Sequence, residues 1–266
     1  MMLPACKVGI SMKLIKPTPW ETRNLGVESF VVCPDFYQAP SEQGLLSEIH
    51  QATREHAHIF IFARVEKRNH AANAILERIG FNFVEQTLEP YIVLSKSHVL
   101  KQFVKNRADF LPKRFTPSDF DNRPLDKVDQ NACAQVSRIA SQSFSDDRFH
   151  LDPKCDHGKA DSRFVFWVQD LLADSQTAFN LLCFKDEVIG FMARKAEHLV
   201  LAGFSRKHLG SGLGEYLWLS VLADMQAGGR AHAHTLISAN NVSVLNLYAR
   251  LGFKFRNPAT TFHYWG

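Results

Sequence analysis

A glycine-rich stretch, Leu209-Gly210-Ser211-Gly212-Leu213-Gly214, has the composition of a phosphate-binding turn. The apolar run 199–204 before it predicts a strand. The residues after it predict an amphipathic helix, because apolar side chains recur at Leu213, Leu217, Val221 and Met225. Alternating glycines let backbone N–H groups approach a ligand, and the first turn of a helix favours an anion. A pyrophosphate is the expected ligand of this turn, although a turn that only packs a helix closely would show the same pattern.

A second motif lies downstream of this turn. Asn241 is followed after six residues by Tyr248, and after three more by Gly252 and Phe253. The apolar side chains between them repeat with helical spacing, and glycine is a common helix stop. The motif therefore predicts a short helix that presents Tyr248 and runs directly into a strand.

The two motifs together resemble the GNAT acetyltransferases, a family that uses acetyl-CoA. The resemblance covers roughly residues 125–266. It implies an α/β fold with a mixed, mostly antiparallel sheet flanked by helices. It also implies a cofactor site in which the glycine turn binds the phosphates, the strand end offers main-chain groups to the pantetheine arm and the oxyanion, and the asparagine contacts the pantetheine. These residues are Phe204, Leu209, Gly210, Ser211, Gly212, Leu213, Gly214 and Asn241.

By the same resemblance, Tyr248 is the general acid. A phenol with a pKa of about 10 can return a proton to a thiolate whose conjugate acid has a pKa of about 8.5. A tyrosine that only packs in the core is the competing interpretation. Leu209 departs from the family pattern, because many members have Gln or Arg at this position, so Arg206 or Lys207 would have to supply the polar contact.

The acceptor side of the site is expected in the segment 144–150. Arg148, Phe149 and His150 are the candidate substrate-binding residues, because arginine pairs well with phosphate and aromatic rings stack on bases. The catalytic base is left unassigned. A chain of water molecules or the Asp146-Asp147 pair would serve.

An internal repeat indicates a duplicated architecture. The residues from Asn69 to Phe83 match those from Asn241 to Phe255 at a constant offset of 172 (241 − 69), with Leu76 in place of Tyr248. We therefore expect a degenerate GNAT-like domain over residues 1–100, a linker over 101–124, and a catalytic GNAT domain over 125–266. Chance recurrence of a common helix-to-strand ending is the alternative.

The layout of the whole chain is similar to the dTDP-fucosamine acetyltransferase group, which joins a shortened GNAT-like domain to a complete one. The stretch Pro19 to Ser29 carries part of this likeness. The resemblance implies N-acetylation of a nucleotide-linked amino sugar. A GNAT enzyme for another amine, such as a peptide or a small metabolite, and a non-catalytic acyl-CoA-binding module are the alternatives.

Composition excludes several other classes. A net charge of +4 without a block of basic residues suits an anionic small ligand better than nucleic acid. No apolar run is long enough to span a membrane, and residues 1–10 lack the apolar core of a signal peptide. Five scattered cysteines indicate reduced thiols and a cytoplasmic protein, and no metal site is expected. The oligomeric state is open, a homodimer included.

Overall fold

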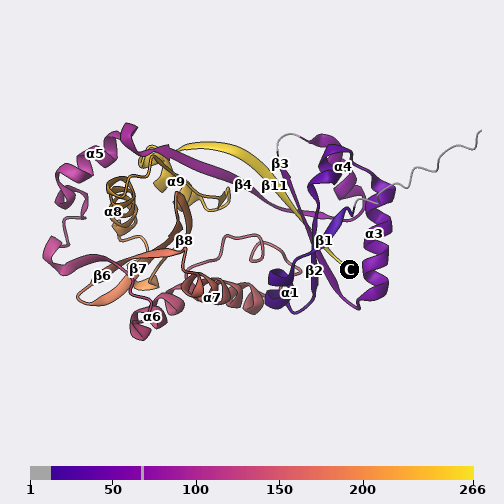
Figure 1. Ribbon diagram of the computed structural model, residues 1–266, viewed down its shortest axis with the longest axis horizontal. Coiled ribbons are helices and arrows are strands. Elements are labelled where there is room, and N and C mark those ends of the chain that lie inside the picture. Colours follow the sequence, from indigo (N-terminus) through magenta and orange to yellow (C-terminus); the bar gives the residue numbers. More distant parts are fainter. Residues whose placement is uncertain (1–12, 67–68) are drawn as a thin grey trace, which may run out of the picture. The chain divides into compact units, whose positions relative to one another are not determined.

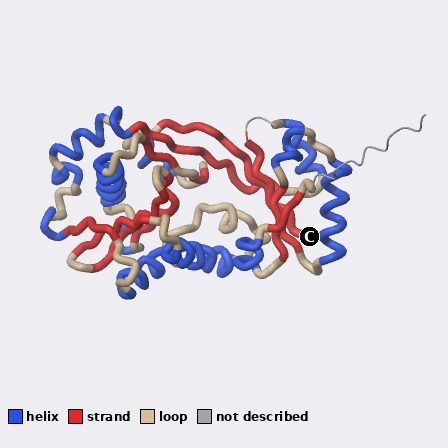
Figure 2. Tube along the Cα trace, viewed as in Figure 1, coloured by secondary structure: helices blue, strands red, loops and turns tan. Residues whose placement is uncertain are grey.

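The computed structural model describes residues 13–66 and 69–266 (Figures 1 and 2). The expectation of no signal peptide over residues 1–10 lies outside this range. Among the described residues, no helix is both long and apolar enough to cross a bilayer, and no group of three or more His, Cys, Asp or Glu side chains is arranged to hold a metal ion.

Strands and helices alternate along the chain. The strands are β1 Ile15–Pro17, β2 Glu28–Val32, β3 Ile59–Glu66, β4 Asn82–Val93, β5 Phe120–Pro124, β6 Ala178–Phe184, β7 Glu187–Lys195, β8 His198–Phe204, β9 His232–His234, β10 Ile237–Ser238 and β11 Lys254–Trp265. The helices are α1 Pro19–Leu25, α2 Pro34–Gln38, α3 Glu42–Glu55, α4 His70–Arg78, α5 His98–Lys105, α6 Gln130–Ala140, α7 His157–Ala173, α8 Leu213–Ala227 and α9 Val242–Arg250.

The chain forms two compact units. The first holds the described residues up to Phe83 together with Thr260–Gly266, and the second holds Val84–Ala259. Residues 84–100, which we expected in the first domain, thus lie in the second unit. The expected linker is also part of that unit and is not structureless, because it contains most of α5 and all of β5.

The sheet of the first unit has the order β1-β2-β3-β11. Strands β2 and β3 are parallel, and the backbone of Ile59 exchanges two hydrogen bonds with Gly266 just beyond the end of β11. The apolar faces of α3 and α4 pack on this sheet through Leu45, Ile49 and Leu76. The unit therefore has its own hydrophobic core.

The sheet of the second unit has the order β11-β4-β9-β8-β7-β6-β5, with β10 paired to β4. The pairs β4-β9, β7-β8, β6-β7 and β5-β6 are antiparallel, whereas β8 and β9 are parallel. Helices α6 and α7 cover one face of strands β6 to β8, whereas α8 covers the other (Figures 1 and 2). Alternate strand residues point into these two cores, as the period of a strand requires.

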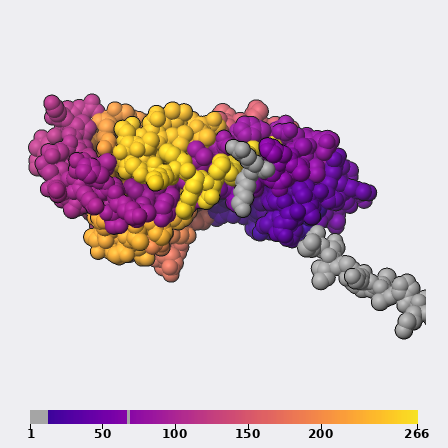
Figure 3. Space-filling model, turned by 90° about the horizontal axis from the view of Figure 1, so that it is seen from above, coloured from indigo at the N-terminus to yellow at the C-terminus, as the bar shows by residue number. Residues whose placement is uncertain are grey.

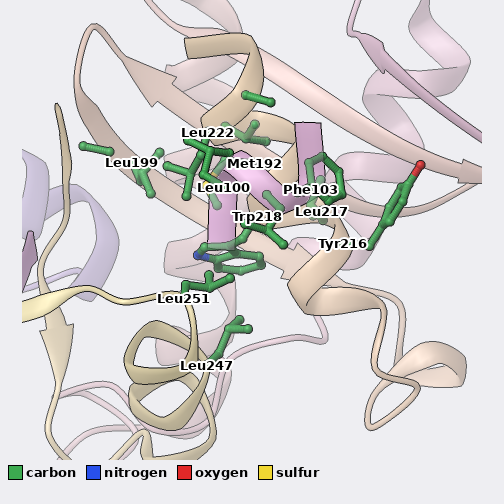
Figure 4. Packing of buried hydrophobic residues seen from close by; sticks show 14 of the residues in the cluster. Leu100, Phe103, Met192, Leu199, Tyr216, Leu217, Trp218, Leu222, Leu247 and Leu251 are labelled. Carbon is green, nitrogen blue, oxygen red and sulfur yellow. The ribbon is translucent and has the colours of Figure 1, made fainter. Parts of the chain in front are cut away.

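Helix α8 is the centre of the larger core. We expected an amphipathic helix, but ten of its fifteen residues are buried, on nearly every side. Figure 4 shows the reason, since Leu100 and Phe103 of α5 pack against it together with Leu247 and Leu251. A helix that is covered all round has no need of a polar face.

The two copies of the repeat have the same local structure. The side chain of Asn69 caps α4 by accepting from the Ala72 N–H, and Asn241 caps α9 by accepting from the Val244 N–H. Both helices are followed by a glycine with positive φ, Gly80 or Gly252, which lets the chain turn into the next strand. The repeat read from the sequence is thus a structural repeat.

The strand that follows each of these helices pairs, over part of its length, with a strand of the other unit. Strand β4 belongs to the first copy but pairs with β9 in the second unit, through Tyr91 and His234. Strand β11 belongs to the second copy, and its last residues lie beside β3 in the first unit. In the space-filling view, yellow residues of the C-terminal segment lie beside purple and magenta residues from the first half of the chain (Figure 3).

Strands β4 and β11 are also longer than we expected. The apolar runs 81–84 and 91–94 by themselves predict two short strands, and 254–256 and 261–265 predict two more. In each case the structure has a single strand, β4 or β11. Polar residues and Pro90 interrupt the apolar pattern of β4. They are tolerated because alternate polar side chains, including Glu85 and Thr87, line a cavity on one face of the strand.

Candidate active site

The glycine-rich turn begins α8 in the manner that its sequence predicts. Gly210 and Gly212 have φ values of +68° and +86°, in the left-handed region that favours glycine. Gly212 is the N-cap residue and has no side chain to cap the helix, but the Ser211 hydroxyl accepts from the Leu213 N–H at 3.3 Å. The next N–H groups of the first turn have no carbonyl within the helix to bind.

Residues outside the motif hold this turn in place. A guanidinium nitrogen of Arg114 donates to the Ser211 carbonyl at 2.9 Å, and a Cβ on Gly212 would lie 3.0 Å from Pro112 Cγ. Around Gly210, by contrast, a Cβ would meet nothing within 4 Å. Leu209 is 58% exposed and donates no side-chain hydrogen bond, so basic residues must supply any polar contact here.

Strands β8 and β9 form a wedge. They are parallel and share a single residue pair, His198 with His234. Immediately afterwards, the Thr235 hydroxyl donates to the Leu199 carbonyl at 2.6 Å, and the chain then leaves to form β10, which pairs with β4 instead. The remainder of β8 is therefore unpaired on this side, which leaves main-chain groups available to a bound molecule.

A cavity of about 290 Å³ occupies this wedge. Its walls come from β4, the loop after α6, α7, β7, β8, α8, the β10 segment and α9. The polar and aromatic side chains that line it are Glu85, Thr87, Ser143, Phe144, Ser145, Asp146, Asp147, Arg148, Arg163, Phe164, Trp167, Trp218, Thr235, Ser238, Asn241 and Tyr248.

Helix α9 places two of the predicted residues on the cavity wall. The carboxamide of Asn241 lines the cavity while its oxygen caps the helix, and Tyr248 lines it two turns further along. Tyr248 is 3% exposed, and burial raises the pKa of its phenol to about 12, although the Trp218 and Thr235 side chains offset part of that effect. The phenol therefore stays protonated at any ordinary working pH.

The glycine turn and the cavity are neighbours. A Cβ on Gly214 would lie 3.6 Å from Leu247 of α9, so the first turn of α8 packs beside the helix that carries Tyr248. Trp218, which lines the cavity, is one helical turn after Gly214, a rise of about 6 Å. Phe204 does not line the cavity, and its carbonyl accepts from the Ser143 hydroxyl at 2.9 Å.

The three expected acceptor residues have different positions. Arg148 lines the cavity. Phe149 is fully buried, with the guanidinium groups of Arg148 and Arg163 over its ring at 4.4 and 4.8 Å, so it has no face to stack on a substrate. The ring of His150 does not line the cavity either, because hydrogen bonds to Asp147 and Asp161 hold it.

Through these hydrogen bonds, His150 connects the loop after α6, which lines the cavity, to Asp161 of α7. The hydrogen bond to Asp147 raises the pKa of His150 against the opposing effect of burial. Burial alone would raise the pKa of Asp147, but hydrogen bonds from His150 and the Phe149 N–H outweigh it, and the pKa is lowered. An imidazolium between two carboxylates thus fixes the loop that carries Arg148.

We expect the hydrogen bonds of His150 to Asp147 and Asp161 to stabilise the fold most at mildly acidic pH. A raised histidine pKa contributes stability below about 6.5 that is lost as pH rises through the folded value. A lowered aspartate pKa contributes above about 4 and is lost on acidification. The difference in melting temperature between wild type and His150→Asn should therefore be larger at pH 5.5 than at pH 9. His157→Asn, at an exposed neighbouring ring, is the control, and an equal difference at both pH values would contradict the assignment.

Several cavity residues had no signal in the sequence. Glu85 and Thr87 belong to β4 of the first copy, and only strand pairing brings them beside Tyr248 on the cavity wall. Ser143 is another, since its hydroxyl proton is shared between the carbonyls of Ile139 and Phe204, which lie 2.6 and 2.9 Å from the hydroxyl oxygen, and so joins the end of α6 to the end of β8. A local pattern cannot show contacts of this kind.

Known structures resemble this chain although its sequence resembles none closely. No family model matches it, and no curated protein matches it. A GCN5-related N-acetyltransferase from Sphaerobacter thermophilus superposes with a TM-score of 0.61 at 14% identity, over 94% of this chain and 76% of that one. A tandem GNAT protein from the clavulanic acid biosynthesis pathway gives 0.58 at 13%, over 90% and 76%. The chain has the GNAT fold.

A third similar structure is a GCN5-related glucosamine N-acetyltransferase region of a fungal multi-domain β-N-acetylglucosaminidase. Its TM-score is 0.58 at 11% identity, and the match covers 90% of this chain but 30% of that longer one. The expected fold class is thereby confirmed, a mixed and mostly antiparallel sheet flanked by helices.

Proposed function

We propose that this protein is an N-acetyltransferase that moves the acetyl group of acetyl-CoA to the amine of a small molecule. The observation that carries the proposal is the place of Tyr248, which lines the cavity where β8 and β9 separate. The glycine turn, one helical turn from the cavity wall, supports it with donors for the phosphates. The cavity volume of about 290 Å³ suits the tip of the pantetheine arm and a small acceptor.

The residues of this chain divide the work as follows. The first turn of α8 holds the phosphates, and the unpaired edge of β8 orients the pantetheine arm. Acetyl-CoA supplies the activated acyl group. Tyr248 holds the proton that the leaving sulfur requires, since its raised pKa keeps the phenol neutral until then. The aromatic walls exclude water from the thioester.

We further propose that the acceptor is a nucleotide-linked amino sugar. Arg148 and Arg163 both line the cavity, and guanidinium groups pair bidentately with phosphate oxygens. The half-buried ring of Trp167 lines the cavity and offers an apolar surface to a base or a sugar. One similar structure is a glucosamine N-acetyltransferase, which supports an amino sugar as acceptor. The free thiols of the four described cysteines agree with a reducing cytoplasm as the site of the reaction.

The reaction is tested by incubation with acetyl-CoA and a panel of amines while thiol release is followed. The panel holds nucleotide amino sugars, free amino sugars, peptides and polyamines. Release with nucleotide amino sugars supports both parts of the proposal. Release with another amine alone keeps the reaction and rejects the acceptor. Binding of coenzyme A without release from any amine favours an acyl-CoA-binding module.

Glu85 is expected to bind the acceptor as its ammonium ion. Glu85 is 6% exposed and lines the cavity, and Glu85→Gln removes its charge at nearly constant shape. We expect the KM for the acceptor to rise by about 30-fold or more, the cost of removing one buried charge partner, with the affinity for acetyl-CoA unchanged. Glu89→Gln is the control on the same strand, because that carboxylate binds Arg256 and Asn257 instead. Equal effects of the two variants would contradict the assignment.

A further inference from the structure

Trp218 carries a buried donor that has no acceptor. It lies on α8, is 6% exposed, and is one of the residues that line the cavity. In the part of the chain that the structure describes, its indole N–H makes no hydrogen bond. Figure 4 shows the indole set among the apolar side chains of the core, with Leu251 and Leu247 nearby. A buried N–H without a partner destabilises a fold, so its presence in a native structure requires an explanation such as a role in the reaction.

The side chain of Tyr248, the proposed acid, lies against the ring of Trp218. The two rings meet edge to face, with centroids 6.1 Å apart and planes at 75°. The Trp218 side chain lowers the pKa of the Tyr248 phenol, as a donor near its oxygen would, although the two groups do not meet the geometry of a hydrogen bond. Thr235 also faces the phenol, but its hydroxyl proton is given to the Leu199 carbonyl at 2.6 Å. Trp218 is thus the donor that remains.

The proposed chemistry creates a need for such a donor. A phenol with a pKa of about 12 is a weak acid for a leaving thiolate whose conjugate acid has a pKa of about 8.5. Once the proton is transferred, a phenolate remains in a site that is shielded from water. A donor aimed at the place where this charge develops lowers the barrier, because it is already oriented before the proton moves.

We propose that Trp218 donates its indole N–H to the Tyr248 oxygen as that oxygen becomes a phenolate. The inference rests on the proposed function. In the step concerned, the bond between the acetyl carbon and sulfur breaks, sulfur keeps the electron pair, and the phenol proton goes to sulfur. The amine loses one proton to water when its bond to the acetyl carbon forms, and water returns one to the phenolate. Trp218 is a positioning residue, since it acts through Tyr248.

A double-mutant cycle tests this coupling. We expect Trp218→Phe to lower kcat by about 10- to 100-fold, the worth of one hydrogen bond to a charged group, with the KM for acetyl-CoA little changed. In the Tyr248→Phe background the same change should have almost no further effect on kcat. Full additivity of the two effects, or an effect of Trp218→Phe on KM alone, would overturn the proposal. Replacement of Trp218 by benzothienylalanine, which exchanges the N–H for sulfur at nearly constant shape, keeps the test valid if phenylalanine loosens the core.

A second readout does not depend on turnover. Tyr248 is replaced by a fluorinated tyrosine, whose phenol is more acidic, and its ¹⁹F signal is titrated with and without the Trp218 N–H. We expect loss of the N–H to raise the pKa of this phenol, and an unchanged pKa would overturn the proposal. If wild type acetylates no amine but the phenol pKa still depends on Trp218, the proposed function fails and the contact stands. If wild type is active and the pKa and the cycle show no coupling, the function stands and the inference fails.

Discussion

Replacement of Tyr248 by phenylalanine is expected to lower the rate of acetyl transfer by about 10²- to 10⁴-fold, the usual contribution of a positioned acid. The ring keeps its edge-to-face contacts with Trp218 and Phe253, so the core should be preserved. Only the hydroxyl is lost, and with it the proton for the leaving thiolate. Affinity for coenzyme A should stay the same, because the phosphates bind at the glycine turn.

Thiol release and calorimetric titration with coenzyme A measure the two quantities separately. Tyr216→Phe is the matched control, since Tyr216 is a buried tyrosine of α8 that does not line the cavity. It should leave the rate within about twofold of wild type, as expected of a change away from the reacting atoms. An active Tyr248→Phe enzyme would remove the phenol from the mechanism and leave the acid unassigned.

Tyr248 also shapes the expected pH dependence. Because burial raises the pKa of its phenol to about 12, the acid remains protonated up to strongly alkaline pH. The rate should therefore rise with pH as the acceptor amine loses its proton, without a descending limb near pH 10.

Gly212→Ala is expected to weaken coenzyme A binding by about 5- to 30-fold. An L-residue in the left-handed region costs about 1–2 kcal/mol, and the new Cβ would lie only 3.0 Å from Pro112 Cγ. If the turn relaxes in the free protein, binding must restore the strained conformation that aims the N–H groups at the phosphates. The affinity then falls by the cost of that strain.

Gly210→Ala is the matched control because its φ is also positive but its Cβ would meet nothing within 4 Å. It should therefore weaken binding less. Titration with acetyl-pantetheine, which lacks the pyrophosphate, gives a second comparison. If Gly212→Ala weakens both ligands equally, the turn is a structural element and the phosphates bind elsewhere.

The helix caps show how much of this fold a sequence can reveal. Asn69 and Asn241 stand at the start of equivalent patterns, and both cap the helix that the pattern predicts. The glycine turn was predictable for the same reason, since left-handed positions and a helix start are properties of a few adjacent residues. The role of Tyr248 could not be predicted from its helical pattern alone, because a tyrosine that only packs in the core has the same pattern. The prediction also required the resemblance to the GNAT family.

The cavity wall shows what sequence could not reveal. Glu85 lies in a polar stretch that we placed between two strands, and its neighbours in the cavity come from the other half of the chain. Helix α5 is short and lay in an expected linker, so the burial of α8 on all sides could not be foreseen. Phe149, expected at the acceptor, is instead buried beneath two arginines. Each of these depends on contacts between distant segments.

The pairing of β4 with β9 and of β11 with β3 has a consequence for how the chain folds during synthesis. Strand β4 is synthesised early but finds its neighbour β9 only after most of the second half has emerged, and β3 must wait for the final residues. Such long-range pairings slow folding and leave strand edges open to wrong partners. Neither half of this polypeptide should therefore form its complete sheet when it is produced alone, whereas the two halves supplied together as separate fragments have the strands that each one lacks.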